Sequence, residues 1–253
     1  MRADVVKAVD VAAGSSDSLP PPTPIVDTTP ARAVADETIG TNTSSTSGLR
    51  MVDSQPAPLA SATIAIDLQL VLHQCRVQNA TFVTYGLQAT PLSALIAAAA
   101  SLFPEHPLIN AAWIETAIVL RHRYHVAAGL TDGHWVLIRD ACDLNERGIA
   151  RALTGTGHDL EMATCAIAVT ADWWQITPPL PGTVAALTLS GAQLKSVALN
   201  DTTIAVGAVA HLSLCYDARV LDHPTAMAFL NALCRRLGVR SLAEPQEDEV
   251  SLV

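Results

Sequence analysis

The residues whose chemistry stands out lie together near the C-terminus of the chain, between His211 and His223. Two carboxylates, Asp217 and Asp222, and the guanidinium of Arg219 stand between these two histidines. A histidine titrates close to neutral pH and can remove a proton from a nucleophile as a general base. His223 or His211 could therefore act as a base, although His223 could equally be a loop residue ahead of a helix and His211 a strand residue on the less apolar face.

A strand and a helix have to position these side chains. From Ile204 to Tyr216 every second residue is apolar, which is the pattern of a half-buried strand whose other face is free for a site. Further on, Pro224 stands where a first helical turn tolerates a missing N–H, and apolar residues recur at helical spacing until Gly238. The polar segment is thus predicted to be a loop between a strand and a helix.

The same segment resembles the signature of the dihydrolipoamide acyltransferase catalytic domain, the core component of 2-oxo acid dehydrogenase complexes. That family usually reads Asp-His-Arg-x-x-Asp-Gly, and this chain matches it at Asp217, Arg219 and Asp222. Ala218 stands at the position of the catalytic histidine, and His223 replaces the glycine. The resemblance implies an α/β fold, the chloramphenicol-acetyltransferase-like two-layer sandwich in which helices flank a mixed β-sheet.

Further matches lie earlier in the chain and in the same order as in the family. The stretch from His106 to Asn110 resembles the family's His-Pro-x-x-Asn segment, and Ile138 to Ala141 resembles its Ile-Arg-Asp-Ala segment. Asp67 matches an aspartate that ends a family strand before a leucine-rich turn. The resemblance therefore extends over most of the predicted folded region.

A second catalytic group of the family is a serine or threonine hydroxyl, which stabilises the tetrahedral oxyanion from a neighbouring subunit. Aligning Thr164 with the family's first threonine puts Ala168 at this position, and the nearest hydroxyl is that of Thr170, about 7 Å further along the strand. Acyl transfer between dihydrolipoamide and coenzyme A needs a base to form the thiolate and donors for the oxyanion. Ala218 and Ala168 supply neither, so the catalytic histidine and serine are both missing.

Three functions remain open, and whether the chain is an enzyme stays undecided among them. The first is a catalytically inactive structural or docking subunit in the core of a 2-oxo acid dehydrogenase complex. The second is an active dihydrolipoamide acyltransferase with rearranged catalytic residues, which would use His223 or His211. The third is a repurposed module that binds CoA or an acyl group. CoA or lipoyl groups are expected as cofactors only if the chain is active.

The expected partners are other subunits. The resemblance implies a homotrimer, or a hetero-assembly with an active acyltransferase or other components of the complex. A net charge of −9 and a pI of about 5.2 argue against nucleic acid or an anionic membrane surface as partner. The longest apolar run, Leu92 to Phe103, is too short to span a bilayer, and the N-terminus has no signal-peptide pattern. We therefore expect a protein of the cytoplasm or the mitochondrial matrix.

Composition divides the chain into three parts. Residues 1–58 hold seven of the fifteen prolines and precede the first aromatic residue, Phe82, so we expect a disordered tail or linker rich in Ala, Pro, Ser and Thr. Residues 59–240 are the predicted acyltransferase-like domain, and residues 241–253 are an acidic C-terminal tail.

Local patterns predict three further elements. Thr90 and Pro91 are typical of a helix cap and first turn, and an alanine-rich helix is expected after them. The Asp-Gly pair at 132–133 between two strand-like runs predicts a hairpin over Ile118–Asp140. A short helix is expected over Glu146–Leu153.

Metal sites and disulfides are not indicated. The five cysteines are scattered and include no Cys-x-x-Cys pair, which argues against a zinc site or a disulfide framework. His122 and His125 lie in the first predicted strand of the hairpin, where residues three apart face opposite sides of a sheet. They are therefore not expected to share a metal ion.

Overall fold

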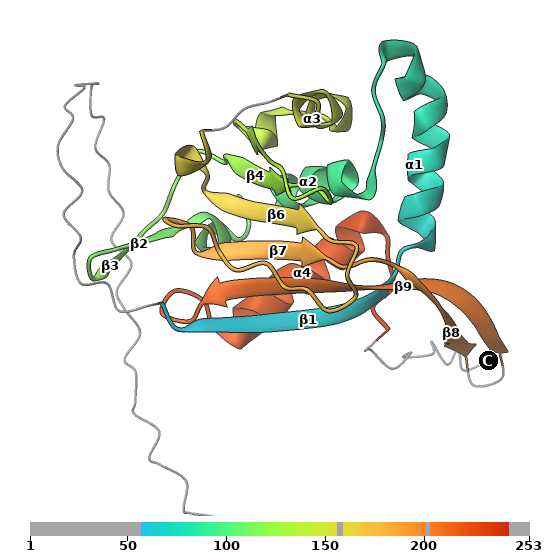
Figure 1. Cartoon of the computed structure of the whole chain (residues 1–253). Helices are drawn as coiled ribbons and strands as arrows, with labels where there is room; N and C mark the ends of the chain where they lie inside the picture. The colour runs from blue at the N-terminus through green and yellow to red at the C-terminus, as the bar shows by residue number, and fades with distance from the viewer. Residues whose placement is uncertain (1–56, 156–158, 201–202, 243–253) are drawn as a thin grey trace, which may run out of the picture. The chain divides into compact units, whose positions relative to one another are not determined.

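The computed structural model describes residues 57–155, 159–200 and 203–242, and this part of the chain contains one large sheet, a small two-stranded sheet and four α-helices (Figure 1). The strands are β1 (Leu59–Asp67), β2 (Ala112–Ile114), β3 (Ala117–Val119), β4 (Val126–Gly129), β5 (Trp135–Ile138), β6 (Cys165–Val169), β7 (Ala185–Leu189), β8 (Gln193–Asn200) and β9 (Thr203–Asp217). The helices are α1 (Gln69–Phe82), α2 (Pro91–Leu102), α3 (Glu146–Leu153) and α4 (His223–Leu237), with short 3-10 helices η1 (Val83–Tyr85), η2 (Pro107–Asn110), η3 (Ala141–Asp143) and η4 (Leu160–Met162).

The large sheet is mixed, and β9 is its central organising strand. The strand order is β1-β9-β7-β6-β4-β5, and β8 pairs with the first half of β9. The β6–β7 and β4–β6 pairs are parallel, whereas β9 runs antiparallel to β1, β7 and β8. Because β9 pairs with three strands, its end at Asp217 is held at a fixed place in the sheet.

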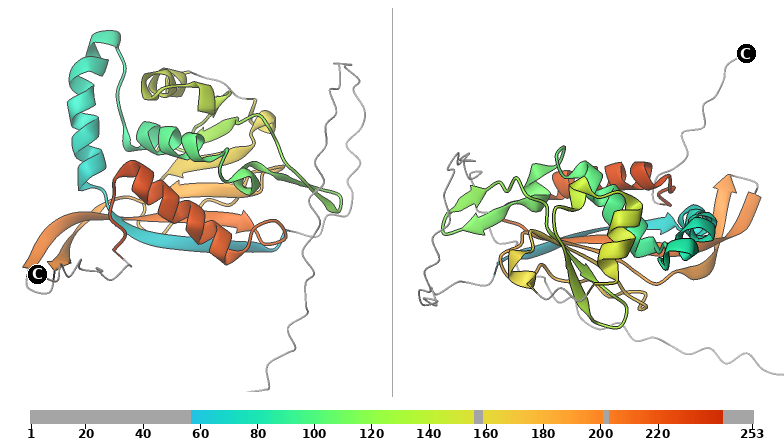
Figure 2. Two further views of the ribbon diagram at one scale, coloured as in Figure 1. Left: turned by 180° about the vertical axis from the view of Figure 1, so that it is seen from behind. Right: turned by 90° about the horizontal axis from the view of Figure 1, so that it is seen from above.

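One face of the sheet is covered by helices α2 and α4, which form the second layer (Figure 2). The side chains of Leu212 and Leu214 in β9 point to this layer and are fully buried. Phe103 and Phe229 stack between the two helices, with ring centroids 6.4 Å apart. The apolar face predicted for β9 is confirmed and meets the helices, but the prediction that its other face is free is wrong, because Ser213 and Asp217 on that face are each only 4% exposed.

The other face of the sheet carries small and polar side chains and is crossed by residues 170–184, which we call the covering segment. Thr63 donates from its hydroxyl to that of Ser213 at 2.9 Å, across β1 and β9. The backbone N–H of Thr177 donates to the Thr188 hydroxyl at 2.9 Å, which fixes the covering segment over β7. Gly191 is needed here because a Cβ at that position would lie 2.2 Å from the carbonyl oxygen of Ala171.

The predicted strand, loop and helix around the signature are confirmed. β9 ends at Asp217, Asp222 caps α4, and Gly238 ends the helix in the left-handed region with φ of 67°. Thr90 caps α2 through a reciprocal pair of hydrogen bonds with Ser93. The short helix predicted over residues 146–153 has the same bounds as α3.

The predicted hairpin is correct only in part. β4 and β5 pair antiparallel across the Asp-Gly turn, but residues 117–119 form β3, which pairs with β2 in the separate sheet. The side-chain amide of Asn110 donates to the carbonyls of Arg121 and Arg123, at 3.1 and 2.9 Å, and holds the chain between β3 and β4 out of any strand. His122 is therefore exposed on a loop while His125 is buried, and the prediction that both lie in one strand is wrong.

The predicted tails fall almost entirely outside the described residues. Residues 57, 58, 241 and 242 are the exceptions. Pro58 accepts the backbone N–H of Ala218 at 2.8 Å, and Leu242 donates its backbone N–H to the carbonyl of Ala65 at 2.8 Å. In the part of the chain that the structure describes, no helix is long and apolar enough to cross a membrane.

Candidate functional site

Asp217 is the anchor of the signature loop. Only 4% of the residue is exposed, and its carboxylate accepts hydrogen bonds from the backbone N–H of Arg219 at 3.0 Å and from the Arg219 Nε at 2.9 Å. These bonds raise the pKa of the Arg219 guanidinium, which also lies 4.9 Å above the ring of Trp113. Both matched residues thus serve to fix the loop, since a nearly buried carboxylate requires a paired cation.

Ala218 follows Asp217, and the sequence resemblance predicts it at the position of the family's base. Its backbone N–H donates to the carbonyl of Pro58 at 2.8 Å, which ties the loop to the chain just before β1. The residue is exposed, and its side chain is a methyl group that has no proton acceptor. The side chain of Ala218 therefore cannot act as a general base.

Asp222 and His223 begin helix α4. The Asp222 carboxylate accepts the backbone N–H of Thr225 at 2.9 Å as the helix cap. Hydrogen bonds from the Thr225 side chain and backbone lower the pKa of Asp222, and the charge of His223 adds a smaller effect in the same direction. His223 is the first residue of the helix and is exposed, so it does not occupy the position of Ala218.

Ala168 lies on β6 on the face opposite the helices, where it pairs with Gly129 of β4 and Thr188 of β7. It is 6% exposed and lines a cavity of about 260 Å³ together with Thr170, the nearest hydroxyl. That hydroxyl donates to the side-chain oxygen of Gln175 at 2.7 Å and accepts the backbone N–H of Asp172 at 3.1 Å. Thr170 thus lines the same cavity as Ala168, but its hydroxyl is engaged in a local turn.

Within one chain the two positions are far apart. Ala168 pairs with Thr188, which in turn pairs with Ser213 of β9, whereas Ala218 lies five residues beyond Ser213. Five residues of strand span about 17 Å. The sequence placed both alanines in one reaction site, and a single copy of the chain does not bring them together.

His211, the other candidate base, lies in an aromatic cluster on the second face of the sheet. Its ring centroid is 4.3 Å from that of Trp173 and 4.9 Å from that of Trp174, and the Lys195 ammonium lies 3.7 Å above Trp173. The Nδ1 atom of His211 is buried and has no hydrogen-bond partner among the described residues. His211 and Ala218 are seven positions apart, which corresponds to about 23 Å of extended strand.

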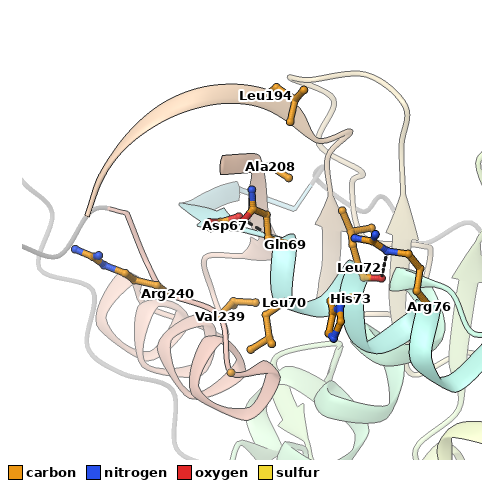
Figure 3. Close-up of a pocket in the computed structure, with 11 residues that line it drawn as sticks. Asp67, Gln69, Leu70, Leu72, His73, Arg76, Leu194, Ala208, Val239 and Arg240 are labelled. Atoms are coloured by element: carbon orange, nitrogen blue, oxygen red, sulfur yellow. Dashed lines mark hydrogen bonds between the residues drawn. The ribbon is translucent and has the colours of Figure 1, made fainter. Parts of the chain in front are cut away.

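The paired part of β8 and β9, residues 193–200 and 203–209, is called the β8–β9 arm here. A groove that the sequence analysis did not identify lies at the other end of β1, between α1 and this arm (Figure 3). Its volume is about 710 Å³, and Asp67 at its centre accepts the backbone N–H of Gln69 at 3.0 Å. The remaining lining combines basic and apolar side chains, chiefly His73, Arg76, Arg240, Leu70 and Leu194. His73 and Arg76 are one helical turn apart and therefore lie on the same side of α1. This spacing is the sequence feature from which this wall of the groove could have been predicted.

Metal ligands do not gather anywhere in the described ranges. No group of three or more His, Cys, Asp or Glu side chains is placed to hold a metal ion there. His125 instead uses its Nδ1 to accept the backbone N–H of Asp140 at 3.0 Å, which is a structural contact.

Comparison with known proteins identifies the fold. No protein-family model matches the sequence, and no curated protein matches it. Among solved structures, a probable dihydrolipoamide acetyltransferase from Listeria monocytogenes superimposes with a TM-score of 0.64 and 21% identity, over 72% of this chain and 85% of that one. The dihydrolipoamide acetyltransferase of Azotobacter vinelandii gives 0.64 and 22% identity over 72% and 82%, and its description assigns a serine, a histidine and an asparagine to its catalytic mechanism.

A truncated catalytic core of the 2-oxoacid dehydrogenase complex from Thermoplasma acidophilum gives a TM-score of 0.58 with 19% identity, over 72% of this chain and 87% of that one. The chain therefore has the α/β fold of acyltransferase catalytic cores. More particularly, the fold is that of the dihydrolipoamide acetyltransferase core, which confirms the fold class and the resemblance predicted from the signature loop.

The cap at Asp222 gives a prediction about stability. Replacement of a helix-capping aspartate by alanine costs about 1 kcal/mol in the free energy of unfolding, whereas asparagine caps nearly as well. We expect Asp222→Ala to lower the denaturation midpoint clearly and Asp222→Asn to lower it only slightly. Urea unfolding of the three proteins at neutral pH measures this, and an unchanged midpoint in Asp222→Ala would contradict the capping role.

The advantage of Asp222 over asparagine should depend on pH. Because the pKa of Asp222 is lowered in the folded protein, the carboxylate stabilises the fold above the ordinary aspartate value of 3.8. This contribution is lost as the pH falls through the lowered pKa. The difference between wild type and Asp222→Asn should therefore be present at neutral pH and vanish in acid.

Proposed function

We propose that this chain is a catalytically inactive, acyltransferase-like subunit that serves as a structural or docking part in the core of a 2-oxo acid dehydrogenase complex. One observation carries the proposal. The Asp217–Arg219 pair that shapes the signature loop is retained, while both positions that would act on substrate, Ala218 and Ala168, bear methyl groups. The fold is intact and the reactive groups are gone.

The chemistry supports inactivity. A thiol with a pKa near 8.5 is mostly protonated at neutral pH, so acyl transfer needs a base. Loss of the base costs about 10²–10⁴ in rate, and loss of one oxyanion donor about 10²–10³. His223 at the start of α4 and His211 in its aromatic cluster are the alternative bases, and neither occupies the position of Ala218.

Assembly is the second half of the proposal. The positions of Ala168 and Ala218 are about 17 Å apart along the sheet, so a shared site would form only between copies. One face of the β8–β9 arm exposes Leu194, Ile204 and Val206 by 78%, 74% and 60%, a surface that a neighbouring subunit would cover. A solved structure with the same fold, at a TM-score of 0.63 and 22% identity, is described as the cubic core of the pyruvate dehydrogenase multienzyme complex. We infer a homotrimer, or a hetero-assembly with an active acyltransferase or other components.

Activity is tested directly. Wild-type protein should release no thiol from acetyl-CoA in the presence of dihydrolipoamide above the uncatalysed rate, because no base reaches the thiol. His223→Ala and His211→Ala should behave in the same way. An active dihydrolipoamide acyltransferase serves as the positive control. Robust wild-type turnover that disappears in either histidine variant would overturn the proposal in favour of rearranged catalysis.

Assembly is tested by light scattering and native mass measurement. We expect a trimer, or co-assembly with an active acyltransferase, and we expect Leu194→Glu and Ile204→Glu to shift the protein to monomers because each places a charge on the apolar face of the arm. Val77→Glu, at an apolar position on α1 that is 59% exposed, is the control and should leave the assembly intact. A strict monomer at micromolar concentrations, with and without the partner, argues against a role in a core.

The groove between α1 and the arm favours one other function, a module that binds CoA or an acyl group. Its volume lies within the roughly 300–1,000 Å³ usual for small-molecule sites. Arg76 and His73 stand on one wall and Leu70 and Leu194 line the apolar part, which suits a molecule with phosphates and an apolar arm (Figure 3). The anchored guanidinium of Arg76, whose Nε donates to the Leu72 carbonyl at 3.2 Å, is the contact to test.

Calorimetric titration with CoA distinguishes this function from the first. If the groove binds CoA, Arg76→Ala should weaken binding by about tenfold or more, because a charge-assisted contact to phosphate is lost. Arg151→Ala, an exposed arginine on α3, is the control and should bind as wild type does. An absence of heat with wild type at millimolar CoA removes the binding-module function.

A further inference from the structure

We infer that Trp135 closes the pocket in which Ala168 lies, so that the reaction site is blocked in space as well as stripped of its reactive groups. The inference rests on the proposed function and concerns the same site. It assigns a role to a side chain on β5 that neither the signature nor the missing residues indicate.

Strand pairing places Trp135, Gly129 and Ala168 side by side on three neighbouring strands. Gly129 of β4 pairs directly with Trp135 of β5 on one side and with Ala168 of β6 on the other. Directly paired residues point to the same face of a sheet. The indole of Trp135 and the methyl group of Ala168 are therefore neighbours across a position that has no side chain.

The distances show where the indole lies. A Cβ on Gly129 would stand 3.0 Å from the Cη2 atom of Trp135, 3.2 Å from its Cζ2 atom and 2.9 Å from the Ala168 Cβ. Such separations leave no room for a side chain at Gly129. The φ angle of Gly129 is outside the left-handed region, so the glycine is required for space and not for its conformation.

It follows that the indole lies over Gly129 with its outer edge directed toward Ala168. The Cη2 atom and the Ala168 Cβ are at most about 5.9 Å apart, because both lie next to the same point. A hydroxyl placed on residue 168 would thus face an aromatic ring. A tryptophan removes roughly 150–250 Å² of surface from solvent when it packs in this way.

The space that remains is small. The cavity of about 260 Å³ beside Trp135 lies below the roughly 300–1,000 Å³ usual for ligand sites. Its far wall is the covering segment, where Gln175 holds the Thr170 hydroxyl at 2.7 Å, so this wall is also fixed. Restoring serine and histidine at positions 168 and 218 would consequently not restore substrate access while Trp135 is present.

Binding of dihydrolipoamide tests the inference without relying on turnover. The full-length wild-type chain, Trp135→Ala and Trp135→Leu are titrated with dihydrolipoamide, and backbone amide signals of residues 168 and 129 are followed by NMR. We expect no saturable binding to wild type, and binding at least about tenfold tighter in both variants, with shifts at these two amides. Indole should compete, because it refills the space left by the missing ring.

Trp174→Ala is the matched control, since it removes an exposed indole that does not line this cavity. It should bind no better than wild type. Trp135 is half-buried, so the leucine variant keeps the apolar contact and carries the test if the alanine variant does not fold. Folding of each variant is checked by its thermal unfolding transition.

Two results would overturn the inference. Wild type could bind dihydrolipoamide as tightly as the Trp135 variants, with shifts at Ala168, which would mean that the pocket is open. A folded variant could also bind no better than Trp174→Ala. Turnover by wild type is a different result, because it refutes the proposed inactivity, whereas an absence of gained binding in an inactive protein refutes only the closure by Trp135.

Discussion

The buried pairing of Asp217 with Arg219 is the interaction on which the rest of the structure depends. A carboxylate that is nearly removed from water is costly unless it is paired and fully hydrogen-bonded. Asp217 meets this condition through Arg219, while its backbone N–H donates to Val184 and its carbonyl accepts from Val220 and Leu221. One residue thereby joins the end of the central strand, the start of β7 and the turn into α4.

The contacts that shape the signature loop depend little on the residues at positions 218 and 168. Ala218 lies on the exposed side of the loop, where a side chain contributes little to packing, and its backbone bond to Pro58 does not depend on the residue type. Ala168 is buried, but a serine and an alanine differ by one small group on a face already rich in small residues. The contacts that hold the loop and the strands therefore do not depend on the side chains at positions 168 and 218, where we propose that the reactive groups are missing.

Much of the fold was predictable from local patterns. The alternation in β9, the Thr90 cap of α2 and the Asp222 start of α4 are short-range signals, and the structure follows them. The first strand of the predicted hairpin was wrong because the Asn110 side chain takes backbone carbonyls that a strand would have used. A contact between residues more than ten positions apart leaves no periodic trace in the sequence.

The sequence predicted which positions belong to the candidate site, but it did not predict how the neighbouring side chains are arranged. The family resemblance predicted Ala218 and Ala168 at the family's catalytic positions. The position of Trp135 over Gly129 instead depends on which residues of β4, β5 and β6 pair with each other. That register is set by the whole sheet. The same holds for the groove, where α1 meets an arm more than a hundred residues away in sequence. Both the position of Trp135 and the groove depend on how distant segments of the chain pack together, which residue type alone does not indicate.

The short pairing of residues 240–242 with the end of β1 has a consequence for the protein in concentrated solution. β1 is the outer strand of the sheet, and an outer strand offers unpaired backbone groups on which another chain can form a ladder. The bridge between Ser241 and Ile66, with the bond from Leu242 to Ala65, occupies the part of this edge whose inward side chains are most apolar. Further along, Ser61 and Thr63 place polar groups beside the open stretch. The few residues that follow α4 thus shield the sheet from growing into a fibre.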